Sequence, residues 1–297
     1  MEITANNLQI LNQGFNAQFL RGIDSVKPQR DLVAMEIPST TASINYAFLQ
    51  QLPGMREWIG DREFNNLIVN NYLLTNRHWE DSISVQRNDI LDDQLGLYAN
   101  RFAMLGEAAA DHPDWLVWQT LMAGFTTIGL DGQYYFDIDH QSWDQTGKSN
   151  VYQNLQSGSG PAWYLMDLSR SFLKPLIFQK RQDINFVAMD LPNDDNNFKR
   201  KEFLYGVDAR YSVGYGFHQL AFGSLATLSA ANFAAAKLAM NTQHKPDGSC
   251  LNVNPTHLIC GPTNEANART LLKSTSISAS TNIWFNAVEL VVVPALG

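Results

Sequence analysis

Residues 92–124 read DDQLGLYANRFAMLGEAAADHPDWLVWQTLMAG, and this stretch predicts the clearest helix of the 297-residue chain. The two aspartates suit a helix N-terminus, and Gly124 suits a C-terminus. Pro113 predicts a kink or a restart, with Asp114 in the first turn of the second segment. Apolar side chains recur at steps of three and four residues, as one face of a helix requires: Leu95, Tyr98, Phe102, Leu105, Ala109, His112, Trp115, Trp118 and Met122.

Towards the N-terminus, residues 1–20 predict an amphipathic helical arm. Its apolar face consists of Leu8, Leu11, Phe15 and Phe19. The segment has neither the basic start nor the continuous apolar run of a signal peptide. A polar link at residues 21–30 and a short strand at 32–37 follow. We expect the arm to pack on another chain or under the 92–124 helix, because burial of each such side chain is worth roughly 1.5–3 kcal/mol.

Between this strand and the long helix, the pattern predicts a long β-hairpin. Residues 56–64 form one strand and 72–85 the return strand, with asparagines that tolerate turn conformations between them. Residues 82–86 alternate polar and apolar, which is typical of a half-buried strand. A two-stranded hairpin is marginally stable alone. We therefore expect its large apolar side chains to contact a partner surface; they are Trp58, Ile59, Phe64, Leu73, Leu74 and Trp79.

The C-terminal half predicts a mixture of strands and helices. Residues 141–161 lack a period and read as a long surface loop, and residues 193–197 read as a polar tip. We predict strands at 163–168, 176–178, 203–222, 256–260 and 288–293, and helices at 229–240 and 263–273, capped by Ser229 and Thr263. Helices and strands are segregated early and alternate late, so the predicted fold class is α+β.

Composition excludes several functional classes. Charged residues make up 17% of the chain, and the net charge of −8 indicates no attraction to phosphates, so binding to nucleic acid or anionic membrane is not expected. The longest uncharged run, residues 218–236, is interrupted by polar side chains, and no membrane span is predicted. Two cysteines are too few for a disulfide framework. Low surface charge is typical of a subunit surrounded by neighbours.

Sequence motifs for chemistry are incomplete. Gly147-Lys148-Ser149 resembles the end of a P-loop, but the glycine required five residues earlier is Ser142. Gly214-Tyr215-Gly216 lacks the third glycine of a dinucleotide fingerprint. His257 and Cys260 fall on opposite faces of a strand without zinc-type partners, and Ser159 lacks a nucleophile elbow. We assign no catalytic, cofactor-binding or metal-binding residues.

One acidic cluster is the best candidate for a site: Asp131, Asp137, Asp139 and His140. Carboxylates and imidazole suit a divalent ion, but the spacing matches no known ligand loop. We interpret the cluster as a structural turn. The alternative is an acidic metal-dependent or carbohydrate-active hydrolase, for which paired carboxylates could serve.

The order of short sequence blocks identifies a family resemblance. The blocks are REWIG (56–60), DDQLGLYA (92–99), DGQYYFDIDH (131–140), WYLMD (163–167), KPLIFQ (174–179), EFLYGV (202–207), GYGF (214–217) and NPTHLI (254–259). In this order the chain resembles the Mu-like prophage major head subunits, the major capsid proteins of transposable tailed phages. The resemblance spans nearly the whole chain, and Gln141 after His140 departs from the expected proline.

The resemblance implies a Hong Kong 97-like major capsid protein fold. The parts it implies are an N-terminal arm and entry strand at 1–45, an extended hairpin loop at 46–88, a peripheral domain with the spine helix at 89–130 and 280–297, and an axial domain with associated strands at 131–279. The apolar residues of the arm and the hairpin would then contact other subunits. The family has no active site to carry over.

The implied function is self-assembly through hexamers and pentamers into the icosahedral head of a Mu-like tailed phage or prophage, enclosing packaged double-stranded DNA. Portal, scaffold or protease proteins would act during assembly in the host bacterial cytoplasm, and a decoration protein could bind the virion. An acidic shell suits weak, nonspecific contact with DNA, because tight binding would resist filling and ejection. A tail or decoration protein is a further alternative within the virion.

Overall fold

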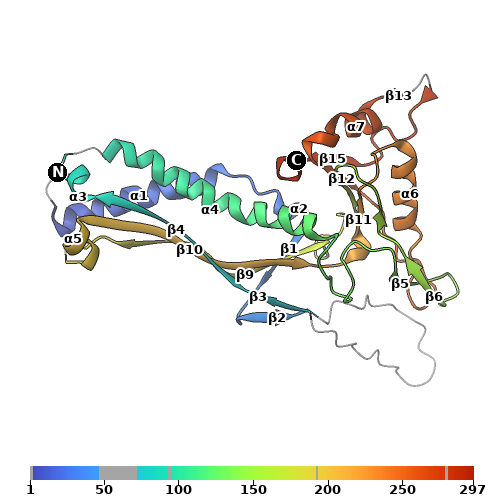
Figure 1. The fold of residues 1–297 in the computed structure, drawn as a ribbon, viewed down its shortest axis with the longest axis horizontal. Coiled ribbons are helices and arrows are strands. Elements are labelled where there is room, and N and C mark those ends of the chain that lie inside the picture. The colour runs from blue at the N-terminus through green and yellow to red at the C-terminus, as the bar shows by residue number, and fades with distance from the viewer. Residues whose placement is uncertain (1–2, 47–71, 93–94, 192, 278–279) are drawn as a thin grey trace.

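The computed structural model describes residues 3–46, 72–92, 95–191, 193–277 and 280–297. The molecule is long, with long helices running over a sheet in one half and a smaller sheet with its own helices in the other (Figure 1). We call these the elongated half and the compact half. Side chains of one continuous core join them, among them Leu121, Tyr215, Tyr164 and Ile259. The mixed architecture agrees with the predicted α+β class.

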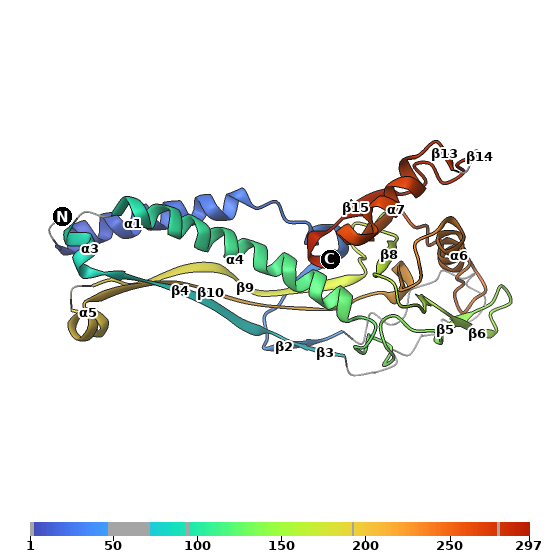
Figure 2. The ribbon, with the colours of Figure 1, turned by 45° about the horizontal axis from the view of Figure 1, so that its top comes forward.

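The elongated half is built on a four-stranded sheet. Its order is β1 (Ala34–Pro38), β9 (Leu176–Met189), β10 (Glu202–Tyr215) and β4 (Arg77–Gln86). β1 runs parallel to β9, and the other pairs are antiparallel. Helices α1 (Ala5–Ser25) and α4 (Leu95–Ala123) lie over the same side of this sheet (Figure 2). Short helices α2 (Arg30–Val33), α3 (Arg87–Leu91) and α5 (Asp195–Arg200) complete this half.

The long helix predicted at 92–124 is confirmed as α4, which begins at Leu95, because Asp92 is the C-cap of α3 and not the start of the long helix. It continues through Pro113 instead of restarting there. The expectation for Asp114 is therefore wrong. Its carboxylate accepts hydrogen bonds from the main-chain N–H groups of Gln29 and Arg30, and pairs with the Arg30 guanidinium at 3.0 Å. Asp114 thus holds the N-terminal end of α2 against the middle of α4.

The predicted amphipathic arm is confirmed as helix α1, which packs on α4 of the same chain. Phe15 stacks on Phe102 with ring centroids 4.2 Å apart. Two glycines let the helices approach closely, because a Cβ added to Gly22 would lie 1.9 Å from the Ala103 carbonyl oxygen, and one added to Gly106 would lie 2.0 Å from that of Phe19. The sequence pattern located the apolar face but not this glycine contact.

The return strand of the predicted hairpin has a different partner from the one expected. β4 pairs with β10 along its whole length. Within the described part of the chain, the short strand β3 (Leu73–Thr75) pairs with the segment before the loop, at β2 (Ser43–Asn45). The other predicted strand, 56–64, lies outside the described residues. Alternation in 82–86 identified a half-buried strand, but alternation does not specify which strand it pairs with.

The compact half is built on a five-stranded sheet. Ser229 caps α6 (Ala230–Asn241) as predicted, because its side chain accepts a hydrogen bond from the Asn232 N–H. The helix predicted at 263–273 is also present, but its N-cap is Gly261, two residues before the predicted cap Thr263. The sheet order is β15 (Glu289–Val292), β12 (His257–Cys260), β8 (Trp163–Met166), β11 (Ala221–Ser224) and β7 (Leu155–Gln156). The other elements of this half are α6, α7 (Pro262–Lys273), β13 (Ser276–Ile277), β14 (Ser280–Thr281), η2 (His218–Leu220) and η3 (Pro294–Leu296).

Two segments predicted as irregular are ordered. Within 141–161, β5 (His140–Trp143) and β6 (Ser149–Tyr152) form a hairpin closed by Asp144, whose carboxylate accepts the Thr146 and Lys148 N–H groups. The P-loop-like Gly147 lies in this turn with φ of 77°. The predicted tip at 193–197 instead leads into α5. The hairpin escaped prediction because the buried positions of β5 are the polar residues His140 and Ser142, so apolar alternation is missing.

Candidate functional site

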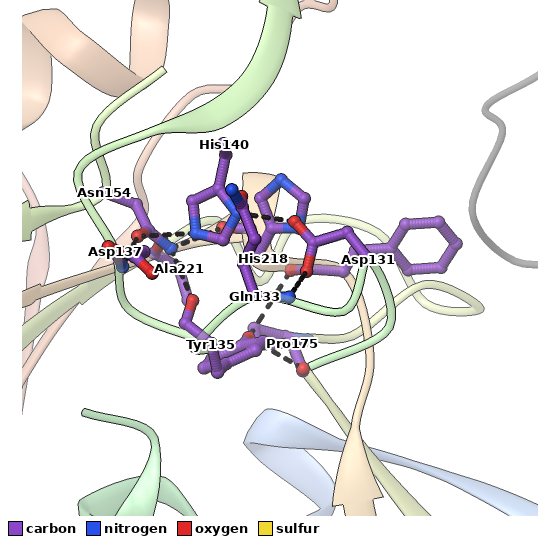
Figure 3. Close-up of polar contacts among 10 residues, drawn as sticks. Asp131, Gln133, Tyr135, Asp137, His140, Asn154, Pro175, His218 and Ala221 are labelled. Atoms are coloured by element: carbon purple, nitrogen blue, oxygen red, sulfur yellow. Dashed lines mark hydrogen bonds and ion pairs between the residues drawn. The ribbon is translucent and has the colours of Figure 1, made fainter. Parts of the chain in front are cut away.

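The acidic cluster named from the sequence is only partly brought together by the fold. Asp131 lies in the turn that follows α4, and His140 begins β5. Asp139 is exposed, and the Asp137 carboxylate accepts the N–H of the next residue, Ile138. The structure adds two residues that sequence reasoning missed, Asn154 and His218 (Figure 3). No local spacing could have found them, because they lie 14 and 78 positions after His140 along the chain.

Both ring nitrogens of His140 face hydrogen-bond acceptors. Nδ1 lies 2.6 Å from Oδ2 of Asp131, and Nε2 lies 3.1 Å from Oδ1 of Asn154. The Asn154 amide is oriented by its other contacts, because its Nδ2 donates to the carbonyl oxygens of Tyr135, His218 and Ala221 while Oδ1 accepts the Asp137 N–H. A ring flanked by two acceptors satisfies both contacts only when both nitrogens carry protons. Each ring nitrogen of the buried His140 side chain therefore faces one acceptor, Asp131 at Nδ1 and Asn154 at Nε2.

His218 stacks on His140, with ring centroids 3.9 Å apart and planes inclined by 10°. Burial, together with the charge of His140, lowers the pKa of His218 to about 3, so its ring is neutral near pH 7. Its Nδ1 lies 3.6 Å from Oδ2 of Asp131, and its buried Nε2 has no hydrogen-bond partner among the described residues. Although burial acts to raise the pKa of Asp131, the His140 hydrogen bond and the two imidazoles lower it below its usual value.

The ring geometry does not fit a shared metal ion. Among the described residues, Asp131, His140 and His218 are the one group of three potential metal ligands with their ligand atoms within 4.8 Å of one another. An imidazole binds a metal in its ring plane, through a lone pair directed at the ion. The nearly parallel rings do not share such a point, and the 2.6 Å separation of Nδ1 and Oδ2 is that of a charge-assisted hydrogen bond.

The other chemical candidates also have structural surroundings. His257 contacts Glu289 at 3.3 Å, and burial raises the pKa of the Cys260 thiol to about 11, which leaves it unreactive at neutral pH. Gly214 and Gly216 lie in or beside β10, as expected for strand glycines. No helix within the described ranges is long and apolar enough to cross a membrane.

The residues predicted to contact other subunits are distributed unevenly. Leu8, Phe15 and Phe19 are buried in the core of the same chain, and Leu11 packs against that core, so this chain already covers them. Leu74 packs against a small core cluster around Tyr46. Leu73 is 61% exposed, whereas Trp58, Ile59 and Phe64 lie outside the described residues.

Trp79 is half-buried and is held by its own subunit. Its indole N–H donates to the Tyr211 carbonyl oxygen at 3.1 Å, and its ring lies 4.4 Å from that of His112. The sequence did not single out several other apolar side chains that the fold leaves exposed, among them Phe198 at the tip of the elongated half and Phe172.

Solved structures with the same architecture are phage capsid proteins. The subunit in the procapsid of bacteriophage JBD30 is 36% identical, with a TM-score of 0.86 over 99% of this chain and 100% of that one. The JBD30 capsid gives 27% identity and a TM-score of 0.80 over 92% of each chain. The fold is therefore that of a phage major capsid protein, a structural protein and not an enzyme.

The family follows from the sequence comparisons. The family model for the Mu-like prophage major head subunit gpT matches residues 8–296. The FluMu prophage major head subunit of Haemophilus influenzae is 37% identical over 278 residues, 91% of this chain and 90% of that one. The major capsid protein of Escherichia phage Mu is 34% identical over 265 residues, 87% of each chain. The chain belongs to the Mu-like prophage major head subunit family, and the hydrolase alternative finds no support.

Proposed function

We propose that copies of this major capsid protein assemble through hexamers and pentamers into an icosahedral head that encloses double-stranded DNA. The observation that carries the proposal is the match to a procapsid subunit over 99% of this chain. Closed shells of identical subunits follow from repeated interfaces of fixed geometry. Size-exclusion chromatography with light scattering and micrographs of the purified protein test this, and a stable small species under all assembly conditions would contradict it.

The parts of the subunit take the roles that the family resemblance implies. Residues 1–45 form the arm and entry strand, 46–88 the extended loop, 89–130 with 280–297 the peripheral domain around the spine helix α4, and 131–279 the axial domain with associated strands. The pairing of β2 with β3 supports a loop that leaves and re-enters the subunit at one place. The full-length α4 supports the spine assignment.

The extended loop joins subunits, and its base is held independently of its tip. Tyr46 N–H donates to the Tyr72 carbonyl oxygen at 3.0 Å, so the two ends of residues 47–71 are adjacent. Beneath them Gln179, fully buried, accepts the Tyr46 hydroxyl proton at 2.8 Å and donates to Asn76 at 2.8 Å. Such a satisfied buried network fixes the base of the loop. The apolar side chains beyond it, Trp58, Ile59 and Phe64, contact an adjacent subunit together with the exposed Leu73.

Replacing residues 47–71 with an Asn-Gly turn tests this role. The turn closes a hairpin between β2 and β3 without stretching the chain. We expect a subunit with an unchanged cooperative thermal transition that forms no shells. Loss of the transition would place the loop in the subunit's own core and contradict the proposal.

A matched pair of point variants sharpens the test. Leu73 and Val151 are equally exposed, at 61% and 60%, on different hairpins. Leu73→Ser should reduce shell yield, whereas Val151→Ser should not, and both should leave the stability of the isolated subunit within about 0.5 kcal/mol. Equal shell yields of the two variants would show that Leu73 is not part of the inter-subunit contact.

The net charge of this chain and the structures of its relatives support interactions with partners other than copies of the same subunit. The net charge of −8 supports weak, nonspecific contact with packaged DNA. The JBD30 capsid is decorated with minor capsid protein trimers, which supports binding of a decoration protein. Portal and scaffold or protease proteins act during assembly in the host bacterial cytoplasm, and the mature protein resides in the virion.

A further inference from the structure

The Asp131–His140–His218 cluster lies where the chain passes from the elongated half into the compact half. Asp131 belongs to the segment between α4 and β5, and His218 belongs to η2, just before the compact-half strand β11. His140 begins the β5–β6 hairpin. The contacts among these three side chains therefore attach residues 129–143 to the compact half.

The cluster can hold one added proton but not two. The only carboxylate in contact with the two imidazoles within the described structure is that of Asp131, and it is 2.6 Å from His140 and 3.6 Å from His218. One proton on His140 satisfies Asp131 and Asn154 together. A second proton, on His218, would put two positive charges in rings whose centroids are 3.9 Å apart. Like charges at this distance in a buried site repel strongly.

Among the residues that the structure describes, no other charged group offsets that repulsion. Tyr152 of β6 faces both rings, at 6.5 Å from His140 and 6.4 Å from His218, and burial keeps its hydroxyl protonated by raising its pKa. Tyr135 donates its hydroxyl proton to Pro175 and also stays neutral, because burial raises its pKa. The carboxylates of Asp137 and Asp139 are turned to their own loop and to solvent.

We propose that Asp131, His140 and His218 form an acid-labile latch, which is closed with one imidazolium and opens, releasing residues 129–143 from the compact half, when a second proton is taken up. In the open state His218 is solvated and binds a proton with ordinary affinity. Acid therefore favours the open state by linkage, since that state binds one more proton. At neutral pH the latch is closed and the junction is rigid.

Hydrogen–deuterium exchange of the full-length, unassembled chain tests the latch. After correction for intrinsic exchange rates, the exchange of peptides within 129–143 gives the equilibrium constant for opening. This constant should increase by up to tenfold for each unit by which the pH falls, between about pH 6.5 and 4.5. Peptides of β8, in the same half, should show no such slope. A pH-independent opening of 129–143 in the wild-type chain would overturn the proposal.

Variants test whether His218 causes the pH dependence of opening, which we call the slope. His218→Phe keeps an aromatic ring on His140 but cannot be protonated, so the slope should disappear. His78→Gln, an exposed histidine on β4, is the matched control and should keep the slope. An unchanged slope in His218→Phe would overturn the assignment. If His218→Phe fails to fold, Asp131→Asn serves instead, because without the carboxylate residues 129–143 should already exchange rapidly at pH 7.5.

Two further measurements examine the closed state. Nitrogen-15 NMR of the His140 ring at pH 7.5 should show both nitrogens protonated, and a neutral ring would overturn the proposal. Equilibrium dialysis against Zn²⁺ should leave the protein without a stoichiometric ion. Retention of one Zn²⁺ per chain, lost in His218→Phe, would replace the latch with a metal site.

Discussion

The α1–α4 contact and the Asp131 cluster hold the subunit together by different physical means. The helix pair is joined by apolar packing and by two glycines whose Cα atoms approach the opposite backbone. The cluster is joined by one charge pair, one buried amide and a ring stack. Apolar packing has no protons to exchange, whereas the cluster depends on a protonation state. We therefore expect the stability of the α1–α4 contact to depend on side-chain volume, and the stability of the Asp131 cluster to depend on pH.

The largest expected effect is a volume change in the helix contact. Gly106→Val would place a Cβ 2.0 Å from the Phe19 carbonyl oxygen, which α1 cannot accommodate without moving away. We expect the free energy of unfolding to fall by ~3 kcal/mol or more. Chemical denaturation measures it. Gly14→Ala is the control, because nothing lies within 4 Å of its added Cβ, and it should stabilise α1 by roughly 0.5–1 kcal/mol. Equal effects of the two variants would contradict the close approach.

The next effect is a loss of polar partners in the cluster. Asn154→Leu keeps the approximate volume but removes hydrogen bonds to His140 and to three carbonyl groups. Buried polar groups left without partners cost about 1–3 kcal/mol each in unfolding free energy, and water entry offsets part of the total. We expect a loss of about 2–3 kcal/mol by chemical denaturation, with Asn154→Asp as the variant that keeps one acceptor. A loss below 0.5 kcal/mol for Asn154→Leu would show that the amide is not a structural tie.

Acidification should affect the cluster before it affects the helix pair. The pKa of His218 is about 3 in the folded chain, below that of the unfolded chain, so the unfolded state binds more protons. Its contribution to stability is complete above pH 6.5 and declines as the pH falls towards 3, by at most ~1.4 kcal/mol per pH unit. Desolvation likewise lowers the pKa values of His112 and His257. Thermal unfolding between pH 7.5 and 4.5 measures the decline, which should be shallower in His218→Phe; parallel curves would assign the acid sensitivity elsewhere.

The smallest expected effect comes from removing a helix cap in the compact half. Ser229 accepts the Asn232 N–H at the start of α6. Ser229→Ala should lower the unfolding free energy by about 1 kcal/mol at neutral and acidic pH alike. Ser229→Thr should recover most of it. A pH-dependent effect would indicate that the compact half titrates as one unit.

The elements that could be predicted are those with local signals. The three- and four-residue spacing of Phe102, Leu105 and Ala109 lies within one helix face, and the α6 cap lies one turn before its partner. Strand pairing was not predictable, because β4 and β10 are more than 100 residues apart at every register position. The site shows the same division. The DGQYYFDIDH block indicated Asp131 and His140, whereas Asn154 and His218 carry no mark in the sequence.

What the sequence by itself determined was the family, the α+β class, the long helix, the amphipathic arm and the absence of any complete catalytic motif, because each depends on residues close together in the chain. Only the tertiary structure decided that β4 pairs with β10, that two glycines 84 positions apart bring α1 against α4, and that two histidines share one carboxylate. The physical reason is that these contacts join distant segments. Their energies depend on shape, burial and charge in the folded chain, and alternation or spacing within one segment contains none of that information.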